Sequence, residues 1–228
     1  MTDPWTPIVA YCERSGPGLW AEPLNAVTNL AFILAAASIL TSDRGRAVDR
    51  WLLGGLMLAV GAGSGLFHTL AVRWASVADV VPIVCFVLFS LWFALVHVAV
   101  IGRVASACVV VIFVVASPFV ASLASGVMGG SAAYLPAFLA IVAVAAVQLA
   151  RARPGGGRLL LAAAVFAVSL AARMADRPFC AVFPPGTHFL WHFLNAGVLW
   201  LVASTILAAG PAPVARRRPQ EGRGVARS

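Results

Sequence analysis

The sequence predicts an all-α protein whose seven helices cross a membrane as one bundle. Of its 228 residues, 61% are hydrophobic and 11% are charged, a composition too apolar for a soluble domain of this size. The apolar residues also gather in runs of roughly 17 to 25, the length a helix needs to cross the hydrocarbon core. Seven such runs occur, at residues 24–40, 51–70, 79–98, 104–123, 132–150, 159–174 and 188–209.

The first run follows an N-terminal segment that does not resemble a cleaved signal peptide. Prolines and a glutamate fall where an apolar stretch would be needed, so the first helix is expected to act as the targeting signal. The sixth run is the shortest, and Arg158 and Arg173 at its ends can extend to the interfaces. No repeat or second domain interrupts the runs. We therefore expect an N-terminal segment over 1–23, a membrane domain over 24–209 and a basic, disordered tail over 210–228.

The arginines predict how the bundle lies in the membrane. All 16 basic residues are arginine and the net charge is +8, but they lie in loops and tail rather than on one soluble face, which argues against a nucleic-acid partner. Twelve arginines lie on one side, in loops one–two, three–four and five–six and in the C-terminal tail. The other side, with the N-terminal segment and the remaining loops, holds four. Because positive residues collect on the cytoplasmic side, the N-terminus is expected outside and the C-terminus in the cytoplasm.

With this orientation, three polar residues from distant parts of the chain reach one membrane depth on the outer side. His68 ends the second apolar run, Asp79 opens the third and His188 opens the seventh. The fourth histidine, His97, lies 18 residues beyond Asp79 in the same run. That separation is about 27 Å along a helix, which assigns His97 to the cytoplasmic end.

The histidines favour a metal site. His188 and His192 share one helix face, about 6 Å apart along its axis, and a metal ion is the commonest partner for two imidazoles in an apolar setting. With His68 they make three ligands, and three protein ligands with a fourth position left for water are typical of catalytic zinc. Asp79 is then expected to accept the proton of that water, and Ser64, one turn before His68, to contact the water or the developing oxyanion.

Each of these residues also has a plainer interpretation. A histidine in a membrane helix can simply form a hydrogen bond to a neighbouring helix. Asp79 can cap the third helix, and Ser64 lies among the glycines of segment 61–65, where small residues let helices pack closely. Haem is another histidine-bound group, but a carboxylate beside the ligands favours a hydrolytic site.

Two cysteines fall on the outer side under the predicted topology. Cys12 lies in the N-terminal segment and Cys180 in the loop before the last run. In an oxidising compartment they can pair and hold the N-terminal segment over the site, and the alternative is two free thiols.

Together these motifs resemble those of the alkaline ceramidases and, more distantly, of the progestin and adiponectin receptor family. The resemblance is carried by Ser64-x-x-x-His68, by Asp79 in Asp-Val-Val-Pro, and by His188-x-x-x-His192. Further matches are Tyr-Cys-Glu at 11–13, the segment 22–29 and Asp-Arg-Pro-Phe-Cys at 176–180. It implies a seven-helix fold, zinc on the three histidines, an assisting serine and aspartate, and a disulfide between the outer cysteines.

The resemblance also implies a candidate calcium site near the N-terminus. Glu13 and Glu22 match its acidic ligands, whereas Ala10 and Ser15 stand where an aspartate and an asparagine are expected. The alternative for Glu22 is to cap or anchor the first helix. The lysine-free, alanine-rich composition suggests a bacterial protein, and hence the inner membrane.

The expected function is that of a zinc-dependent hydrolase that cleaves the amide of ceramide or a similar N-acyl lipid into a fatty acid and a long-chain amine. The alternative is a lipid receptor or sensor of the same fold with structural zinc and little turnover. A transporter is disfavoured because no pair of helices broken by glycine or proline recurs in corresponding halves of the chain.

Overall fold

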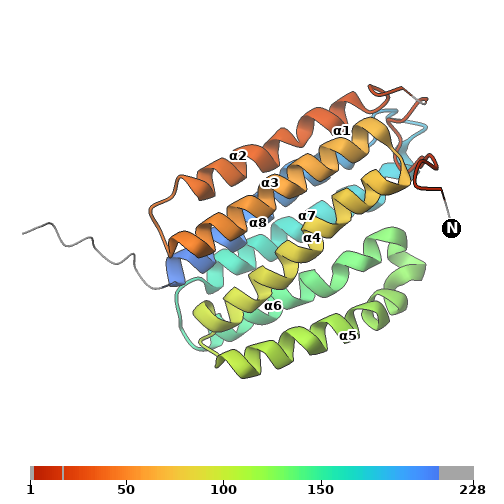
Figure 1. Cartoon of the computed structure of the whole chain (residues 1–228). Helices are drawn as coiled ribbons and strands as arrows, with labels where there is room; N and C mark the ends of the chain where they lie inside the picture. The colour runs from red at the N-terminus through yellow and green to blue at the C-terminus, as the bar shows by residue number, and fades with distance from the viewer. Residues whose placement is uncertain (1–2, 17, 211–228) are drawn as a thin grey trace, which may run out of the picture.

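The computed structural model describes residues 3–16 and 18–210. The regular secondary structure of this part of the chain consists of helices (Figure 1). The predicted tail covers 210–228, and all of it except Gly210 lies outside the described residues. The helices are α1 Pro23–Thr28, α2 Leu30–Leu40, α3 Ala47–Leu70, α4 Arg73–Phe93, α5 Arg103–Met128, α6 Leu135–Ala150, α7 Gly156–Phe179 and α8 His188–Ala209, with a π-helical turn η1 Ala94–Val98 and a 3₁₀ segment η2 Gly129–Tyr134.

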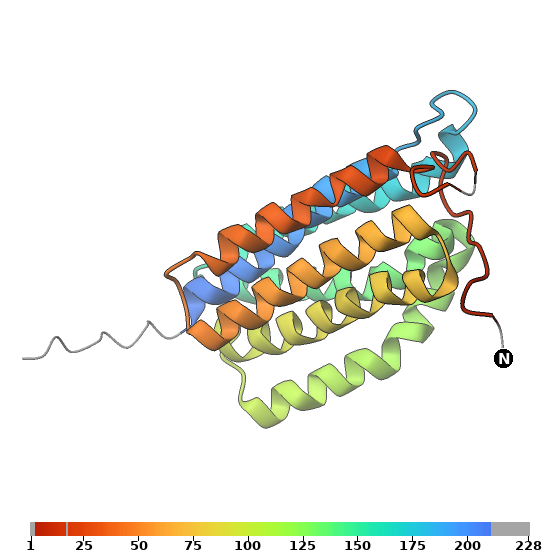
Figure 2. The same ribbon diagram turned by 45° about the horizontal axis from the view of Figure 1, so that its top comes forward.

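Six helical stretches in the described residues are long and apolar enough to cross a membrane, as in an integral membrane protein. They are Pro23–Leu40, Ala47–Leu70, Arg73–Val98, Arg103–Ala150, Gly156–Phe179 and His188–Ala209. The fourth stretch is 48 residues long and contains both α5 and α6. Within it the chain turns back at η2, where Gly129 has a positive φ of 52°, and α5 and α6 lie side by side (Figures 1 and 2).

Several helices begin before the apolar runs that predicted them. Hydropathy marks only the lipid-compatible part of a helix, whereas backbone hydrogen bonding continues through polar residues at its ends. The helix predicted to begin at Asp79 therefore begins at Arg73, with Val72 as its N-cap. Asp79 lies in the second turn of α4, so the alternative that it caps this helix is wrong. His68 does lie in the last turn of α3, and His188 is the first residue of α8.

Helix α8 forms the centre of the bundle and α5 lies at its edge. Buried residues of α8 extend along its length from His188 to Leu207, whereas α5 buries only Ser106. Most exposed side chains of α5 are apolar, among them Ile112 and Phe119, as expected for a lipid-facing helix. Because the first turns of α8 are enclosed by other helices, its two histidines face the interior.

Close packing between α3 and α4 depends on one glycine. A Cβ atom at Gly63 would collide with the backbone carbonyl of Ala78 and lie 3.2 Å from the Cα of Asp79. The missing side chain therefore lets the two helices approach at this level. As a result Ser64, the next residue in α3, lies against the turn of α4 that carries Asp79.

The N-terminal segment lies across the end of the bundle that carries the histidines. Its backbone pairs with the α3–α4 turn, since Ile8 donates to the carbonyl of Ala71 and Arg73 donates to that of Thr6. Figure 2 shows this segment and the α7–α8 loop at the same end of the molecule.

Candidate metal centre

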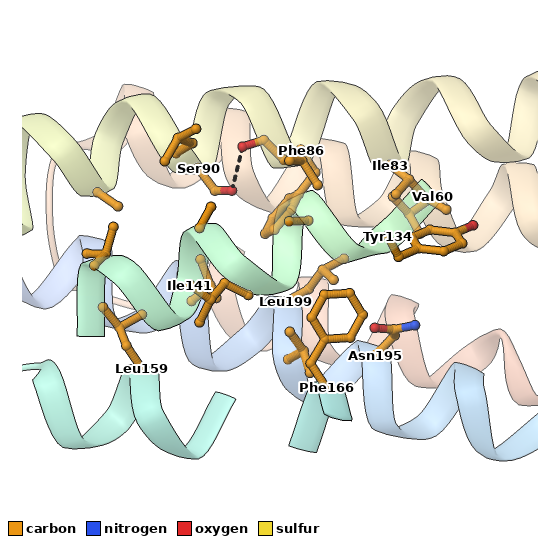
Figure 3. Close-up of a pocket in the computed structure, with 18 of the residues that line it drawn as sticks. Val60, Ile83, Phe86, Ser90, Tyr134, Ile141, Leu159, Phe166, Asn195 and Leu199 are labelled. Atoms are coloured by element: carbon orange, nitrogen blue, oxygen red, sulfur yellow. Dashed lines mark hydrogen bonds between the residues drawn. The ribbon is translucent and has the colours of Figure 1, made fainter. Parts of the chain in front are cut away.

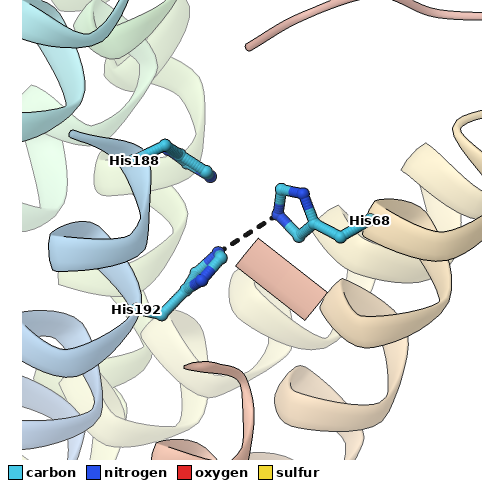
Figure 4. Close-up of side chains that lie close together, drawn as sticks. All are labelled: His68, His188 and His192. Atoms are coloured by element: carbon cyan, nitrogen blue, oxygen red, sulfur yellow. Dashed lines mark hydrogen bonds between the residues drawn. The ribbon is translucent and has the colours of Figure 1, made fainter. Parts of the chain in front are cut away.

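Three buried histidines converge at this end of the bundle (Figure 4). His68 comes from the last turn of α3, and His188 and His192 come from the first two turns of α8. One ring nitrogen of each lies within 4.8 Å of the others. The predicted trio is therefore brought together, by helices that are more than a hundred residues apart in the chain.

Two of the imidazoles are oriented by hydrogen bonds on their Nδ1 atoms. Nδ1 of His68 lies 2.6 Å from Oε2 of Glu22, and Nδ1 of His192 lies 2.8 Å from the hydroxyl of Thr28. A carboxylate only accepts, and the Thr28 hydroxyl donates its own proton to the carbonyl of Leu24 at 2.8 Å. With Nδ1 as the donor in both rings, each Nε2 keeps a lone pair.

These two lone pairs face each other. The Nε2 atoms of His68 and His192 are 3.1 Å apart, and with both Nδ1 atoms protonated the neutral rings have no proton to share between them. A cation between the rings removes the repulsion. Zinc at about 2.0–2.1 Å from each nitrogen with tetrahedral angles would separate the two nitrogens by about 3.3–3.4 Å. The third ring, His188, is 2% exposed, and its Nδ1 has no hydrogen-bond partner among the described residues. The donor set thus fits a divalent metal ion such as zinc.

Glu22 is itself held by Arg14. The Arg14 guanidinium donates from Nε to Oε1 of Glu22 and from a terminal nitrogen to the backbone carbonyl of His68 at 3.2 Å. Burial by itself would raise the pKa of Glu22, but the hydrogen bonds and charges of His68 and Arg14 outweigh burial and hold this pKa below its ordinary value. The carboxylate is therefore ionised at neutral pH and orients His68, the usual arrangement behind a metal-bound histidine.

Both glutamates of the candidate calcium site have protein donors. Glu13 accepts from the backbone nitrogens of Leu24 at 2.6 Å and Asn25 at 2.8 Å, so it caps α1. Glu22 occupies the N-cap position of α1 but makes no side-chain capping bond there, because its oxygens are directed to Arg14 and His68. The calcium site stays a prediction, and the observed contacts explain both carboxylates without it.

The two predicted catalytic residues lie beside the histidines. The half-buried carboxyl of Asp79 has the Ser64 hydroxyl, the His68 imidazole and the Arg173 guanidinium as its charged and polar neighbours. Ser64 is 5% exposed and precedes His68 by one turn of α3. A carboxylate and a hydroxyl therefore stand on the same side of the metal centre.

The fourth histidine is remote from the centre, as predicted. His97 lies in the π-helical turn η1, and its Nε2 is 3.9 Å from the carboxylate of Asp49 near the start of α3. His68 is in the last turn of that same helix, so the two histidines stand at opposite ends of the bundle.

Cys12 and Cys180 form the predicted disulfide, with Cα atoms 5.2 Å apart. Beside the disulfide, the carboxylate of Asp176 accepts from the backbone nitrogens of Cys12 at 3.0 Å, Thr187 at 2.8 Å and His188 at 3.0 Å. One carboxylate thus joins the N-terminal segment to the first turn of α8. The covalent and hydrogen-bonded links together hold the N-terminal segment over the histidines.

Three side chains beside the centre were not predicted to act there. The ring of Tyr11 stacks on His188 at 3.5 Å between centroids, and its hydroxyl accepts from Arg173 at 2.8 Å. Burial raises the pKa of Tyr11 to about 12, despite the opposing charge of Arg173, so the phenol stays protonated. Thr28 is the third. Tyr11 and Thr28 belong to the quoted motifs, but nothing in their spacing indicates contact with a histidine.

An apolar cavity extends between the helices (Figure 3). Trp191 and Asn195 of α8 line it near the histidines, and Val202 lines it farther along, about 16 Å away at 1.5 Å per residue. Between them lie Phe86, Ile141, Leu159, Phe166 and Leu199. The few polar groups include Ser90, whose hydroxyl donates to the carbonyl of Val87. The cavity suits a hydrocarbon chain.

Comparison with known proteins adds no assignment. The chain matches no family model, no curated protein and no solved structure. The histidine cluster and the adjoining cavity are therefore the evidence for function.

Proposed function

We propose that the protein is a zinc-dependent amide hydrolase of the membrane that cleaves ceramide or a similar N-acyl lipid into a fatty acid and a long-chain amine. The observation that carries this proposal is the approach of the Nε2 atoms of His68 and His192 to 3.1 Å, next to an apolar cavity. The two facing nitrogens favour a cation between the rings, and the cavity accommodates a hydrocarbon chain. The resemblance of the motifs to those of the alkaline ceramidases is in accord with both.

His68, His188 and His192 would hold the metal, while Glu22 and Thr28 fix two of the rings. When bound, zinc supplies Lewis acidity that makes water a nucleophile at neutral pH.

The residues of the α3–α4 contact would then handle protons and charge. Asp79 takes a proton from the attacking water and passes it to the amine nitrogen as the carbon–nitrogen bond breaks. Ser64 donates a hydrogen bond to the oxygen that becomes negative during attack on the carbonyl. The products are a carboxylate, which takes the water oxygen, and a free amine.

The membrane arrangement is part of the proposal. If Arg103–Ala150 crosses the bilayer twice, once as α5 and once as α6, seven helices span it. The arginine distribution favours an outer N-terminus in a bacterial inner membrane. A disulfide at the end that carries the metal centre is in accord with that end facing an oxidising compartment.

The decisive experiment is to measure fatty-acid release from a panel of N-acyl lipids by purified protein of known zinc content. Release that disappears on chelation, returns with zinc and is lost in Asp79→Asn would support a hydrolase. Zinc-loaded protein that binds these lipids without releasing fatty acid would instead support the receptor or sensor.

A further inference from the structure

Arg173 of α7 is a cation placed in an aromatic enclosure. Its guanidinium carbon lies 5.5 Å from the ring centroid of Tyr11, 5.3 Å from that of Tyr134 and 5.3 Å from that of Trp191. Such contacts stabilise a guanidinium electrostatically. They do not replace in-plane acceptors for its nitrogens.

The hydrogen-bonding capacity of this guanidinium is incompletely used. One terminal nitrogen donates to the Tyr11 hydroxyl at 2.8 Å, whereas the buried Nε has no partner among residues 3–16 and 18–210. The ion pairs found in this part of the chain are Arg14–Glu22, His68–Glu22 and His97–Asp49, so Arg173 has no carboxylate within 4.0 Å. A cation in a membrane helix is costly to leave unpaired, and such residues usually serve a ligand or a transported species.

The carboxylates at this end of the bundle are not paired with Arg173. The negative charge of Glu22 is already matched by Arg14. Asp79 is the acidic residue whose charge acts on both Arg173 and His68, but it forms no ion pair with Arg173. The other buried carboxylate here, Asp176, accepts from the backbone nitrogens of Cys12, Thr187 and His188. Among the described residues the guanidinium therefore has no direct anionic partner.

The guanidinium stands where the metal centre meets the cavity. Tyr11 stacks on His188 and accepts from Arg173, which fixes Arg173 beside that ligand. The other two enclosing rings, Tyr134 and Trp191, line the apolar cavity. A lipid with its hydrocarbon chain in the cavity and its amide at the metal would have its headgroup close to Arg173.

We propose that Arg173 binds a carboxylate on the headgroup of the substrate, so that the preferred substrates are acidic N-acyl lipids such as N-acyl amino acids. This inference rests on the proposed hydrolase function and specifies its substrate class. A guanidinium carries parallel N–H groups that match the two oxygens of a carboxylate. The fatty-acid product carries the same chemistry, so the experiment includes it separately.

The test uses two substrates that differ only in the headgroup. N-palmitoylglycine carries a carboxylate and N-palmitoylethanolamine carries a neutral hydroxymethyl group in its place. We expect zinc-loaded, full-length protein to favour the acid by roughly 10- to 100-fold in kcat/KM, in line with a charge-assisted pair. In Arg173→Gln this ratio should fall towards one, and in Arg173→Lys it should fall only partly. Arg177→Gln, an exposed arginine one turn farther along α7, is the matched control and should keep the ratio.

Equilibrium binding of both lipids and of palmitate, measured on the same zinc-loaded proteins, separates the remaining outcomes. Equal hydrolysis of the two amides by the unmodified protein would overturn the headgroup assignment and leave the hydrolase intact. Weaker palmitate binding in Arg173→Gln with an unchanged substrate ratio would assign Arg173 to the product and also overturn the proposal. If neither amide is hydrolysed, the hydrolase fails, and selective binding of N-palmitoylglycine that depends on Arg173 would still support the anion site. Equal binding of the two amides would refute it.

Discussion

Nε2 of His68 lies 3.1 Å from Nε2 of His192, while Nδ1 of each ring is already engaged by Glu22 or Thr28. This contact joins α3 to α8 at their ends, and it brings two unprotonated nitrogens together when Nδ1 is the donor in both rings. Because a neutral pair of such rings has no proton to share, the contact is favourable with a metal and unfavourable without one. Metal binding should therefore contribute to folding as well as to chemistry.

The first prediction concerns the ligands. His188→Ala and His192→Ala each remove one of three donors, so both zinc content and thermal stability should fall. Metal analysis by mass spectrometry and melting temperatures in detergent provide the two readings. His97→Ala is the control. This histidine lies at the other end of the bundle near Asp49, so the variant protein should keep its zinc. Full zinc content in His192→Ala would remove this residue from the metal centre.

The second prediction concerns the groups behind the ligands. Glu22→Gln and Thr28→Val should each weaken zinc affinity by about 10- to 100-fold, the usual effect of losing an outer-shell partner. Arg14→Gln should act in the same direction, because it releases the Glu22 carboxylate. Competition with a calibrated zinc chelator measures the affinities. Wild-type affinity in Glu22→Gln would mean that the bond from His68 does not tune the metal.

The third prediction separates ligands from catalytic residues. Asp79→Asn keeps the shape of the side chain but removes the proton acceptor, so zinc should stay while kcat falls by about 10²- to 10⁴-fold. Ser64→Ala should also keep zinc and lose about 10- to 10³-fold if the hydroxyl contacts the oxyanion. Zinc content and fatty-acid release are measured on the same preparations. Loss of zinc in Asp79→Asn would identify Asp79 as a ligand rather than a base.

The sequence predicted the features that follow from helical periodicity and from the side of the membrane on which each helix end lies. The i,i+4 spacing of His188 and His192 places them on one face wherever the helix lies, and the alternating direction of the predicted helices placed His68 at the same end. The disulfide partners Cys12 and Cys180 followed from the same topology.

Other features depend on packing that a linear pattern does not contain. Thr28 contacts His192 only because α1 lies against α8, and Arg173 turns inward rather than towards the interface because three aromatic rings enclose it. The start of α4 was misplaced because hydropathy does not register its polar first turn. The capping of the first helix, considered as the alternative for Glu22, is performed by Glu13, since the fold of the N-terminal segment decides which carboxylate reaches α1.

The last prediction concerns the disulfide, which acts on the metal centre through Asp176. Cys12→Ser removes a link that spans 168 residues and should lower stability by about 2–4 kcal/mol. It also frees the N-terminal segment, which carries Arg14 and Tyr11, so zinc affinity should fall in the same variant. The melting temperature and chelator competition report the two effects.

The matched variants decide whether the disulfide itself is responsible. Cys180→Ser should reproduce Cys12→Ser, and the double variant should be no worse than either single one, because both changes break the same bond. Cys85→Ser, a change at a free cysteine of α4, should leave stability and zinc affinity near those of the unmodified protein. Additive losses in the double variant would show that the two cysteines act separately, and that the N-terminal segment is held by hydrogen bonds such as that from Cys12 to Asp176.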